Sequence, residues 1–561
     1  MKWDMRTMVL WALCPLGCGY ALGVLAQSQT PAGNPLDGLP PTPAAAQAPG
    51  VPLEVKPPQQ SADFLAQTVV PRRFDITGVR SVPFERVAKV FAPLAGQSVT
   101  LARIVETGTE ITRIYQQAGY ALSFAFVPPQ DFREGVVKVT VVEGHIAQLH
   151  IEGDTGRSAA LLRALAAPLL AEKPLRSATF ERQTQRMARI PGVRITASAQ
   201  LPTTTDGATT LVLASTYQPV TLSMGADLRQ GQSKALATVV ANDLLGAGSQ
   251  LSATSLLRPW DQERFVALGY QHWLHANGTL LKANASQYRQ TVADGPGLQG
   301  IDDLTQQRRI DVAVQYPWVL SQSTALLATA GLYGQNYQRS FTERASGAQI
   351  VTEERVRALY AQLNWVSATP RMVRNASATL AHGFNVLGAG MERRTNLGVE
   401  LAPHPAKTTF WRLALDAGIR HGWANGVGAA FSVGGQYSPD VLPVAERISF
   451  GSSRFGRGYQ AGEAAGDSGL GAAAELNYSW NLQHRWIKQV QPYVLYEAAR
   501  TRQVQQGLPA ATLRSAGIGV RLSNQRYYSA DVALAKPLGD ASYHNPERKL
   551  RVSVLLTYQL D

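Results

Sequence analysis

The chain has 561 residues and a formal net charge of +13, from 53 lysines and arginines against 40 acidic residues. This length exceeds what a single hydrophobic core normally spans, so we expect several domains, or one large closed sheet with smaller modules. The positive charge is spread thinly, which suits an anionic lipid surface and argues against a nucleic-acid partner.

Cysteine placement and motif content argue against redox, metal or catalytic chemistry. The two cysteines, Cys14 and Cys18, both lie in the first 26 residues. A chain that loses this segment contains no thiol for a disulfide or a metal site. The sequence contains no G-x-S-x-G elbow, no H-E-x-x-H pair and no P-loop, and its nine histidines are isolated. We therefore expect no enzyme activity, no cofactor and no metal.

Residues 1–26 have the pattern of a cleaved export signal, with a charged start, an apolar stretch and the small-residue exit Val24-Leu25-Ala26. A membrane anchor and a lipoprotein site at Cys18 are the alternatives. Residues 27–71 are rich in Pro, Ala, Gly and Gln and predict an extended linker. No run of about 18 apolar residues follows. Contact with a bilayer would therefore require a closed barrel.

Two small α+β modules are predicted next, at residues 72–147 and 148–217. In the first, "RRFDITGV" predicts a strand, "PFERVAKVFAPL" predicts a helix beginning at Pro83, and "LARIVETGTEITRIYQQAGY" predicts a helix ending at Gly119. The strands "LSFAFVPPQ" and "GVVKVTVVEG" complete it. The same β-α-α-β-β order recurs in the second module, ending with "VRITASAQL" and "TTLVLAST". The repeat predicts two modules of one kind.

Residues 218–561 change to segments of about ten residues in which apolar and polar side chains alternate. In "FWRLALDAGIR", "LGAAAELNYSW" and "RVSVLLTYQL" one face is apolar and the other polar. Aromatic pairs near segment ends suggest an interfacial girdle: Tyr316 and Trp318, Tyr333 and Tyr337, Tyr478 and Trp480, Tyr527 and Tyr528. About sixteen strands predict an all-β transmembrane barrel with room for a lumen. A soluble β-sandwich is the alternative.

The run "IYQQAGYALSFAFVPPQDFREGVVKVTVVEGHIAQLHIEG", residues 114–153, resembles the first POTRA module of two-partner secretion outer-membrane translocators. These form the TpsB class, the haemolysin and filamentous-haemagglutinin secretion-activation family of the POTRA-plus-barrel superfamily. The resemblance rests on the helix end, the "PPQ" stretch and the "VVEG" strand end. It assigns the POTRA motif to Gly119, Tyr120, Pro128, Pro129, Gln130, Glu143 and Gly144.

A second stretch, "LPVAERISFGSSRFGRGYQAGEAAGDSGL" at residues 442–470, looks like the family's signature for a long loop that folds back into the barrel lumen. The resemblance implies that Arg457, Gly458 and Tyr459 anchor this loop. It also makes Glu497 the candidate lumen partner of the arginine, which needs a carboxylate away from bulk water. A solvated loop charge is the alternative for Arg457.

The chain departs from the family pattern at several positions. Gly456 replaces the valine before the arginine, and Ser452 replaces a loop glycine. We expect Gly456 and Gly458 to let the loop turn sharply and approach the wall. Glu497 stands where the superfamily has an aspartate, and Ala499 replaces its glycine. The chain ends on Leu560-Asp561, where relatives end on an aromatic residue, and the Pro-rich linker is not expected to form a plug helix.

The resemblance implies an outer-membrane pore whose POTRA modules lie in the periplasm. There they would recognise a partner exoprotein, a TpsA-type haemolysin or adhesin, and the barrel would pass it outward unfolded and without ATP. Extended peptides could bind the module sheets by strand addition. Lipopolysaccharide and the BAM machinery for assembly are the further partners implied. The alternative functions are a barrel insertase or assembly factor of the same superfamily and a soluble periplasmic protein.

Overall fold

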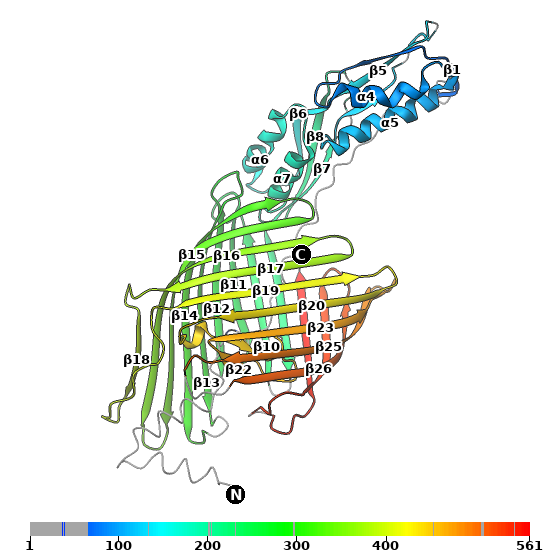
Figure 1. Ribbon diagram of the computed structural model, residues 1–561. Coiled ribbons are helices and arrows are strands. Elements are labelled where there is room, and N and C mark those ends of the chain that lie inside the picture. The colour runs from blue at the N-terminus through cyan, green and yellow to red at the C-terminus, as the bar shows by residue number, and fades with distance from the viewer. Residues whose placement is uncertain are drawn as a thin grey trace.

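The computed structural model describes Leu36, Leu39 and residues 65–560, except residues 129, 133, 200, 201, 203, 204, 230, 231, 295–297, 453, 506–509, 543 and 544. The predicted signal segment lies outside the described residues, as does most of the predicted linker. Two small modules are followed by a closed barrel, and the C-terminal strand ends on the side of the modules (Figure 1).

The first module packs two helices on a three-stranded sheet. Its sheet has the order β2-β5-β4, in which β2 is parallel and β4 antiparallel to β5. Apolar residues of α5 at helical spacing, including Ile104, Ile111 and Tyr115, are fully buried against the sheet. The elements are β1 Thr68–Val69, β2 Arg73–Thr77, α4 Phe84–Phe91, η2 Ala92–Leu94, β3 Val99–Thr100, α5 Leu101–Gln117, β4 Phe124–Phe126 and β5 Val136–Val142.

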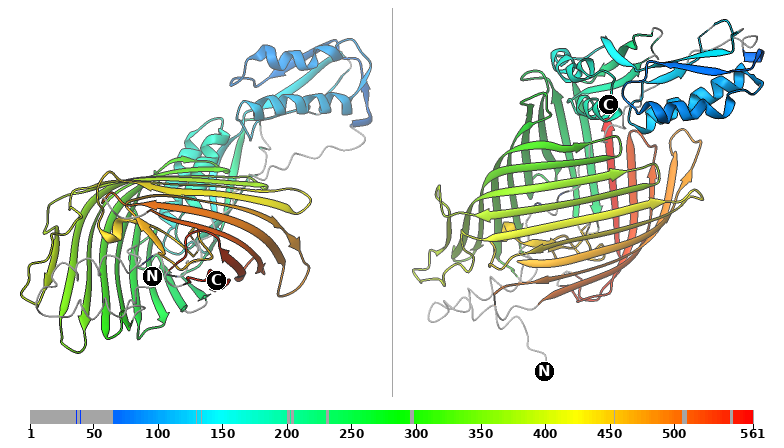
Figure 2. Two further views of the ribbon diagram at one scale, coloured as in Figure 1. Left: turned by 60° about the horizontal axis from the view of Figure 1, so that its bottom comes forward. Right: turned by 45° about the horizontal axis from the view of Figure 1, so that its top comes forward.

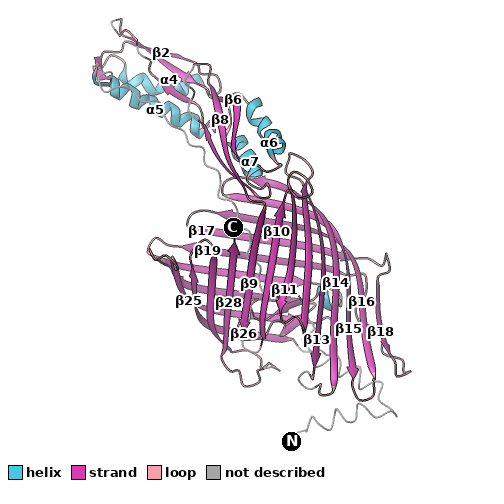
Figure 3. Ribbon diagram, turned by 180° about the vertical axis from the view of Figure 1, so that it is seen from behind, coloured by secondary structure: helices cyan, strands magenta, loops and turns pink. Residues whose placement is uncertain are grey.

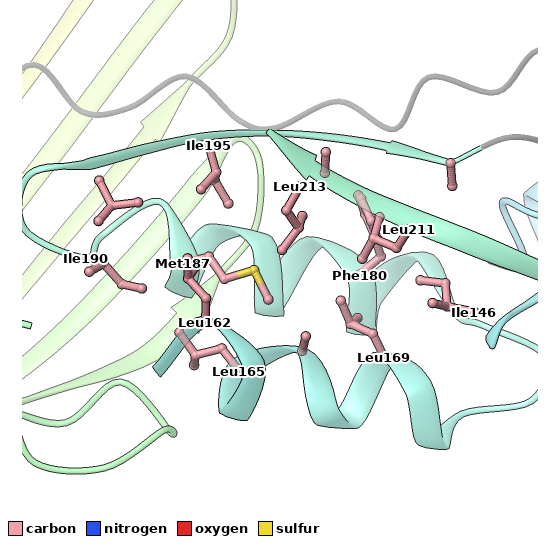
Figure 4. Close-up of a cluster of buried hydrophobic side chains, with 14 of the residues drawn as sticks. Ile146, Leu162, Leu165, Leu169, Phe180, Met187, Ile190, Ile195, Leu211 and Leu213 are labelled. Carbon is pink, nitrogen blue, oxygen red and sulfur yellow. The ribbon is translucent and has the colours of Figure 1, made fainter. Parts of the chain in front are cut away.

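The second module repeats this topology, with the order β6-β8-β7 and a parallel β6–β8 pair. Figure 4 shows its core, in which Leu162, Leu165 and Leu169 of α6 face Phe180 and Met187 of α7 beneath the sheet. The elements are β6 His145–Gly153, α6 Ala159–Ala171, α7 Ser177–Met187, β7 Val193–Ala199 and β8 Ala208–Tyr217. Strand β6 begins three residues before the expected boundary at residue 148.

A carboxylate in the first barrel turn on the module side joins the second module to the barrel. Asp243 accepts hydrogen bonds from the backbone N–H of Arg157 at 3.0 Å and of Gly248 at 2.8 Å. The Ser158 hydroxyl lies 3.3 Å from both carboxylate oxygens. Because Ser158 is the N-cap of α6, this charge sits at the positive end of the helix. Trp273 of the barrel is part of the module's core.

The remaining chain forms a closed antiparallel barrel of 16 strands, as predicted. Each strand pairs with its neighbour, and β28 pairs with β9 to close the ring. Strand β18 Gly390–Thr395 pairs with β16 beyond the end of β17, and β24 Trp480–Asn481 pairs with β25 beyond β23. The strands are β9 Val220–Arg229, β10 Gln232–Asn242, β11 Ser249–Arg258, β12 Glu263–Trp273, β13 Leu280–Ala293, β14 Ile301–Leu320, β15 Thr324–Glu343, β16 Gln349–Ala368, β17 Met372–Gly383, β19 Trp411–Gly422, β20 Val427–Tyr437, β23 Ser468–Tyr478, β25 Gln489–Arg502, β26 Ala511–Ser523, β27 Tyr528–Pro537 and β28 Arg551–Leu560.

Alternation along the strands sorts side chains between the outer face and the lumen. The outward face carries exposed apolar residues such as Leu415, Leu476 and Val552, whereas buried polar residues such as Asp311 and Gln335 face inward. This is the pattern of a barrel whose outer face contacts lipid. No helix within the described residues is both long enough and apolar enough to cross a membrane.

The girdle expectation is wrong for one aromatic pair. Trp318 and Trp480 are exposed on the outer face at strand ends, but Tyr333 and Tyr337 are only 2% and 4% exposed and line the lumen. The guanidinium of Arg309 lies 3.8 Å from the ring centre of Tyr333. A cation–π contact therefore takes the place of the interfacial role assigned to this tyrosine.

Strand length is uneven around the barrel. Strands β14, β15 and β16 each have 20 residues, whereas β9, β27 and β28 have 10. The long strands extend past the others at the end remote from the modules (Figures 1 and 3). Leu36 and Leu39 pack on a lumen cluster that includes Leu236 and Phe265. These two linker residues are therefore held by the lumen wall.

Candidate functional site: the lumen loop and the module junction

The segment between β20 and β23 folds back into the barrel, as the motif at residues 442–470 implied. It forms η3 Val444–Glu446, β21 Ile448–Phe450 and β22 Ala464–Gly466, and β21 pairs with β22. The left view of Figure 2 shows this gold and orange loop inside the ring of strands. Apolar residues of the loop pack on Ala499 and Leu513 of the wall. We call residues 438–467 the lumen loop.

Arg457, at the tip of the lumen loop, reaches the wall formed by β25 and β27. Its backbone N–H donates to Glu497 Oε2 at 2.7 Å, and its Nε lies 3.8 Å from Glu497 Oε1. Its guanidinium also donates to the Tyr493 hydroxyl at 2.6 Å and lies 3.5 Å from Asp531 Oδ2. The structure therefore brings Arg457 and Glu497 together and adds a second carboxylate, Asp531, that the sequence did not single out.

The contacts of Arg457 belong to a larger charge network on the lumen wall. Tyr493 donates to Asp531 at 2.6 Å, and Arg521 makes a two-nitrogen contact with Glu475 at 2.7 and 2.5 Å. Arg521 also lies 3.4 Å from Asp531 and 4.1 Å from the ring centre of Tyr493. The two arginines share Asp531 and Tyr493. Each cation is matched by a carboxylate, as partly desolvated charges require.

Gly458 and Tyr459 fix the tip by close approach and burial. A Cβ at Gly458 would lie 2.6 Å from the backbone nitrogen of Pro537, so only glycine allows the loop this near to β27. Its N–H donates to the Ser515 hydroxyl at 3.2 Å. Tyr459 is 1% exposed, and its hydroxyl accepts from the Gly539 N–H at 2.9 Å.

The lumen loop turns sharply at two adjacent places, Gly451–Phe455 and Gly456–Tyr459. Neither Gly456 nor Gly458 has a positive φ, whereas Gly451, Ser452 and Phe455 have φ values of 126°, 55° and 53°. The backbone nevertheless turns tightly from Gly456 to Tyr459, where the Tyr459 N–H donates to Gly456 O at 2.9 Å, and this turn does not need the left-handed conformation. Ser452 occupies a left-handed position that favours glycine, and its N–H donates to Gly456 O at 2.8 Å and Tyr459 O at 3.1 Å.

The base of the lumen loop is held by further carboxylates of the same motif. Asp467, fully buried, accepts from the N–H of Leu442 and of Val504, both at 2.8 Å, and its Oδ1 lies 3.5 Å from Arg447 Nε. Glu446 lies 3.1 Å from Arg412 of β19. These contacts close the two arms of the loop on each other and fasten them to the wall.

A polar cavity of about 280 Å³ lies beside the loop tip. Arg457, Glu497, Glu475 and Arg521 line one part of it, and Asn375 and Arg420, near the ends of β17 and β19 on the module side, line another. The tip therefore borders a space that continues toward the modules. Among the described residues no cluster of three or more His, Cys, Asp or Glu side chains is placed to hold a metal.

In the first module the Glu143 carboxylate stabilises the fold by accepting four hydrogen bonds. Its Oε1 accepts from the N–H of Arg80 at 2.8 Å, the N–H of Ser81 at 2.7 Å and the Tyr115 hydroxyl at 2.8 Å, and its Oε2 accepts from the Ser81 hydroxyl at 2.8 Å. Burial opposes its ionisation, but these donors outweigh burial and hold the pKa of Glu143 below its ordinary value. Burial and the Glu143 carboxylate raise the pKa of Tyr115.

The other described glycines and tyrosine of the POTRA motif lie where the two modules meet. A Cβ at Gly144 would lie 2.3 Å from Leu122 O, and Gly144 O accepts from the Leu175 N–H at 3.0 Å. Gly119, with φ 88°, accepts from the Ser177 N–H at 2.7 Å. The ring of Tyr120 packs edge-on against Tyr115. These residues build the junction between the modules.

Gln130 completes the edge of strand β5. Its amide accepts from Lys138 N–H at 2.7 Å and donates to Lys138 O at 2.9 Å, as the backbone of a neighbouring strand would. It also donates to Pro128 O at 3.2 Å. Pro129 lies outside the described residues. The Gln130 side chain therefore satisfies backbone hydrogen-bonding groups of β5 that lie beyond the end of the short strand β4.

The C-terminal strand carries an aromatic residue near its end. Tyr558 is exposed on the outer face and is the register partner of Tyr528. Leu560, opposite Leu222, continues the same outward face. The outward positions of β28 thus present an aromatic side chain two residues before the leucine.

Two signals in the sequence could have found more of the site. Asp467, Glu446 and Arg447 stand inside the loop motif and could have been assigned with Arg457. Asp531 alternates with outward apolar residues in "YSADVALAK", which marks it as a lumen carboxylate. No local signal pairs it with Arg457, because the pairing depends on the position of the loop tip.

Comparison with known proteins agrees with this architecture. Residues 69–144 match the POTRA domain of ShlB type, and residues 221–522 match the haemolysin secretion/activation protein family ShlB/FhaC/HecB. The heme/hemopexin transporter protein HuxB of Haemophilus influenzae is 18% identical over 88% of this chain and 89% of its own length.

Solved structures show the same fold. CdiB from Escherichia coli has a TM-score of 0.63 at 19% identity, covering 90% of this chain and 93% of CdiB. BamA from Haemophilus ducreyi lacking POTRA domains 1-3 has a TM-score of 0.53 at 12% identity, covering 88% of this chain and all of that one. The chain therefore belongs to the ShlB/FhaC/HecB family of haemolysin secretion/activation proteins, the two-partner secretion translocators of the outer membrane, whose POTRA modules are periplasmic.

Proposed function

We propose that this protein recognises a partner exoprotein in the periplasm through its POTRA modules and passes it, unfolded, through the barrel to the cell surface. The observation that carries the proposal is the lumen loop. Its tip is held by hydrogen bonds and ion pairs from Arg457 to Glu497, Tyr493 and Asp531, and by no covalent link. Such contacts can be exchanged for contacts with a passing chain, so the loop is suited to a removable obstruction.

The modules have strand edges that suit recognition of an extended chain. In the orders β2-β5-β4 and β6-β8-β7, no described strand pairs with the outer edges of β2, β6 or β7. An unpaired edge offers a row of backbone donors and acceptors, to which an unfolded segment can add as a new strand. Gln130 occupies part of the β5 edge, which leaves the outer edges as the better candidates.

The partner is a secreted protein in this proposal, of the kind that the names of the relatives suggest: HuxB is a heme/hemopexin transporter protein, and CdiB is an outer membrane transporter. Export needs no ATP if folding of the cargo outside the cell prevents its return. Insertion of the barrel itself would use the BAM machinery, and lipopolysaccharide would contact its outer face. No metal or cofactor takes part.

Planar-bilayer recording of purified protein tests the pore. We expect brief openings in the wild type and a steady conductance after deletion of residues 451–463. Absence of conductance in both proteins would contradict the proposal. A strain that lacks the gene should lose one secreted protein. Loss of many outer-membrane proteins at once would instead support a barrel insertase, whose fold is shared by BamA.

A further inference from the structure

A second carboxylate contacts the lumen loop from a different wall of the barrel. Glu354 of β16 is 1% exposed, and its Oε2 accepts from the Val444 N–H of the lumen loop at 2.8 Å. Its Oε1 lies 3.1 Å from Nε2 of His404. His404 belongs to residues 396–410, the segment between β18 and β19, and its side chain is 5% exposed.

The hydrogen bonding of His404 defines its tautomer. The Ala406 N–H donates to His404 Nδ1 at 3.2 Å, so Nδ1 is an acceptor and carries no proton. In the neutral imidazole the proton then lies on Nε2, the nitrogen that faces Glu354. One buried carboxylate therefore contacts two segments that both lie outside the strands: it accepts a hydrogen bond from the Val444 N–H, and its other oxygen lies 3.1 Å from His404 Nε2 without a hydrogen bond.

Val444 and His404 are the residues that contact the Glu354 carboxylate directly. Arg393 of β18 and Tyr337 of β15 also interact electrostatically with it. A buried carboxylate that loses a donor is strongly disfavoured. Glu354 thus favours the arrangement in which residues 396–410 and the lumen loop stay together.

The tip contacts of the loop and its contact with Glu354 lie nearly across the barrel from each other. In the strand order β16-β17-β19-β20-β23-β25-β26-β27, Glu354 is at one end and Asp531, a partner of Arg457, is at the other. This arc is close to half of the 16-strand ring. Removing the tip contacts alone would therefore leave the first arm of the loop fixed to β16.

We propose that Glu354 is a positioning residue that clasps residues 396–410 to the first arm of the lumen loop, so that the two segments open as one unit. The inference rests on the proposed function, in which the loop closes the pore. It adds a second point of release to the tip contacts of Arg457, and it makes residues 396–410 a part of the closure.

Glu354→Gln is the sharpest test. The amide keeps the shape of the side chain but has one acceptor oxygen, so its NH2 must face either the Val444 N–H or His404 Nε2. The matched control is Glu353→Gln on the opposite face of β16, where Glu353 lies 2.8 Å from Arg355 in a more exposed pair. Loss of a hydrogen bond to a buried charge predicts roughly tenfold to hundredfold more channel openings for Glu354→Gln. The control should match the wild type.

Limited trypsin digestion of the same proteins gives a second readout, because Arg447, Arg454 and Arg457 are cleavage sites in the lumen loop. We expect cleavage at these sites to accelerate by a similar factor in Glu354→Gln. His404→Ala should have the same effect, and the double variant should exceed neither single one, since both remove one contact.

Equal opening frequency and equal cleavage in Glu354→Gln and Glu353→Gln would overturn the clasp. Heat-dependent gel mobility shows whether each variant is folded, and if Glu354→Gln is not, His404→Ala tests the same contact from outside the strands. If deletion of the loop tip opens a pore but the Glu354 variants behave as controls, the clasp fails and the proposed function stands. If no pore opens at all, the proposed function fails and the trypsin result still decides the clasp.

Discussion

Two glutamates of the recognised motifs, Glu143 in the first module and Glu497 in the barrel, serve different kinds of structure. The Glu143 carboxylate accepts hydrogen bonds from uncharged groups within one small domain: the backbone N–H groups of Arg80 and Ser81 and the hydroxyls of Ser81 and Tyr115. Glu497 receives an arginine from a loop that folds back into the lumen to reach it. The first arrangement fixes a fold, whereas the second joins two parts of the chain that can separate.

Some of these residues therefore maintain the fold, whereas others control transport. The described POTRA motif residues hold the module core and the junction, and none of them lies on an open sheet edge. The lumen loop residues make ion pairs with the barrel wall, such as Arg457 with Glu497 and Asp531, which join two parts of the chain that can separate. Variants of the loop should therefore affect transport before they affect folding, and variants of the modules should do the reverse.

Arg457→Ala should have the largest effect on transport. It leaves Glu497 without its cation and Asp531 with Arg521 alone, and it frees the tip, at a cost of about 2–3 kcal/mol because the pair is only partly exposed. We expect secretion of the partner to fall sharply while heat-dependent gel mobility stays normal. Arg454→Ala is the control, since its 3.4 Å contact with Asp416 is well exposed and contributes about 0–1 kcal/mol. Normal secretion with unchanged trypsin sensitivity of the loop would contradict the anchoring role.

Gly144→Ala should destabilise the modules and leave the barrel folded. The added methyl group would overlap Leu122 O and force the junction apart, at a cost of about 1–3 kcal/mol. All described α-helices lie in the modules, so the helical circular-dichroism signal reports their unfolding. Gly108→Ala in α5 is the control, because nothing lies within 4 Å of its added methyl group. A lower unfolding temperature for the control than for Gly144→Ala would refute this role.

Glu143→Gln should cost about 1–2 kcal/mol and remove a pH dependence. The folded-state pKa of Glu143 is depressed, so its stabilising contribution is present above its ordinary pKa of about 4.3 and is lost as the pH falls through the folded-state value. The helical signal of the wild type should therefore melt earlier in acid, and the difference from Glu143→Gln should shrink. A constant difference in unfolding temperature across this pH range would show that Glu143 does not stabilise the module as an ionised carboxylate.

Asp243→Asn should have the smallest effect, about 1 kcal/mol. Asparagine tolerates the φ of 55° but has one acceptor oxygen for the N–H groups of Arg157 and Gly248. The second module should melt slightly earlier while conductance stays unchanged. An altered conductance would show that this link to the barrel also controls the pore. Residues that maintain the fold and residues that control transport would then not be separate groups.

The sequence by itself determined the architecture. Alternation along "FWRLALDAGIR" or "RVSVLLTYQL" separates an apolar from a polar face within one strand, so it predicts a barrel without knowledge of the neighbours. The same rule also places Tyr333 and Tyr337 on the lumen face, because they alternate in phase with Gln335 and Arg339. Proximity to a segment end was the weaker signal, and it misplaced both tyrosines.

Only the tertiary structure decided which charges meet. Arg457 and Glu497 are 40 residues apart in the chain, and Asp531 is further still. Their contact depends on strand register and on turns at Gly451, Ser452 and Phe455, of which the last two are not glycines. Glu354 and His404 meet for the same reason, because the lumen brings together strands and loops that no local pattern relates. Local alternation determines whether a side chain faces outward or into the lumen. Closure of the ring determines which other side chains it contacts there.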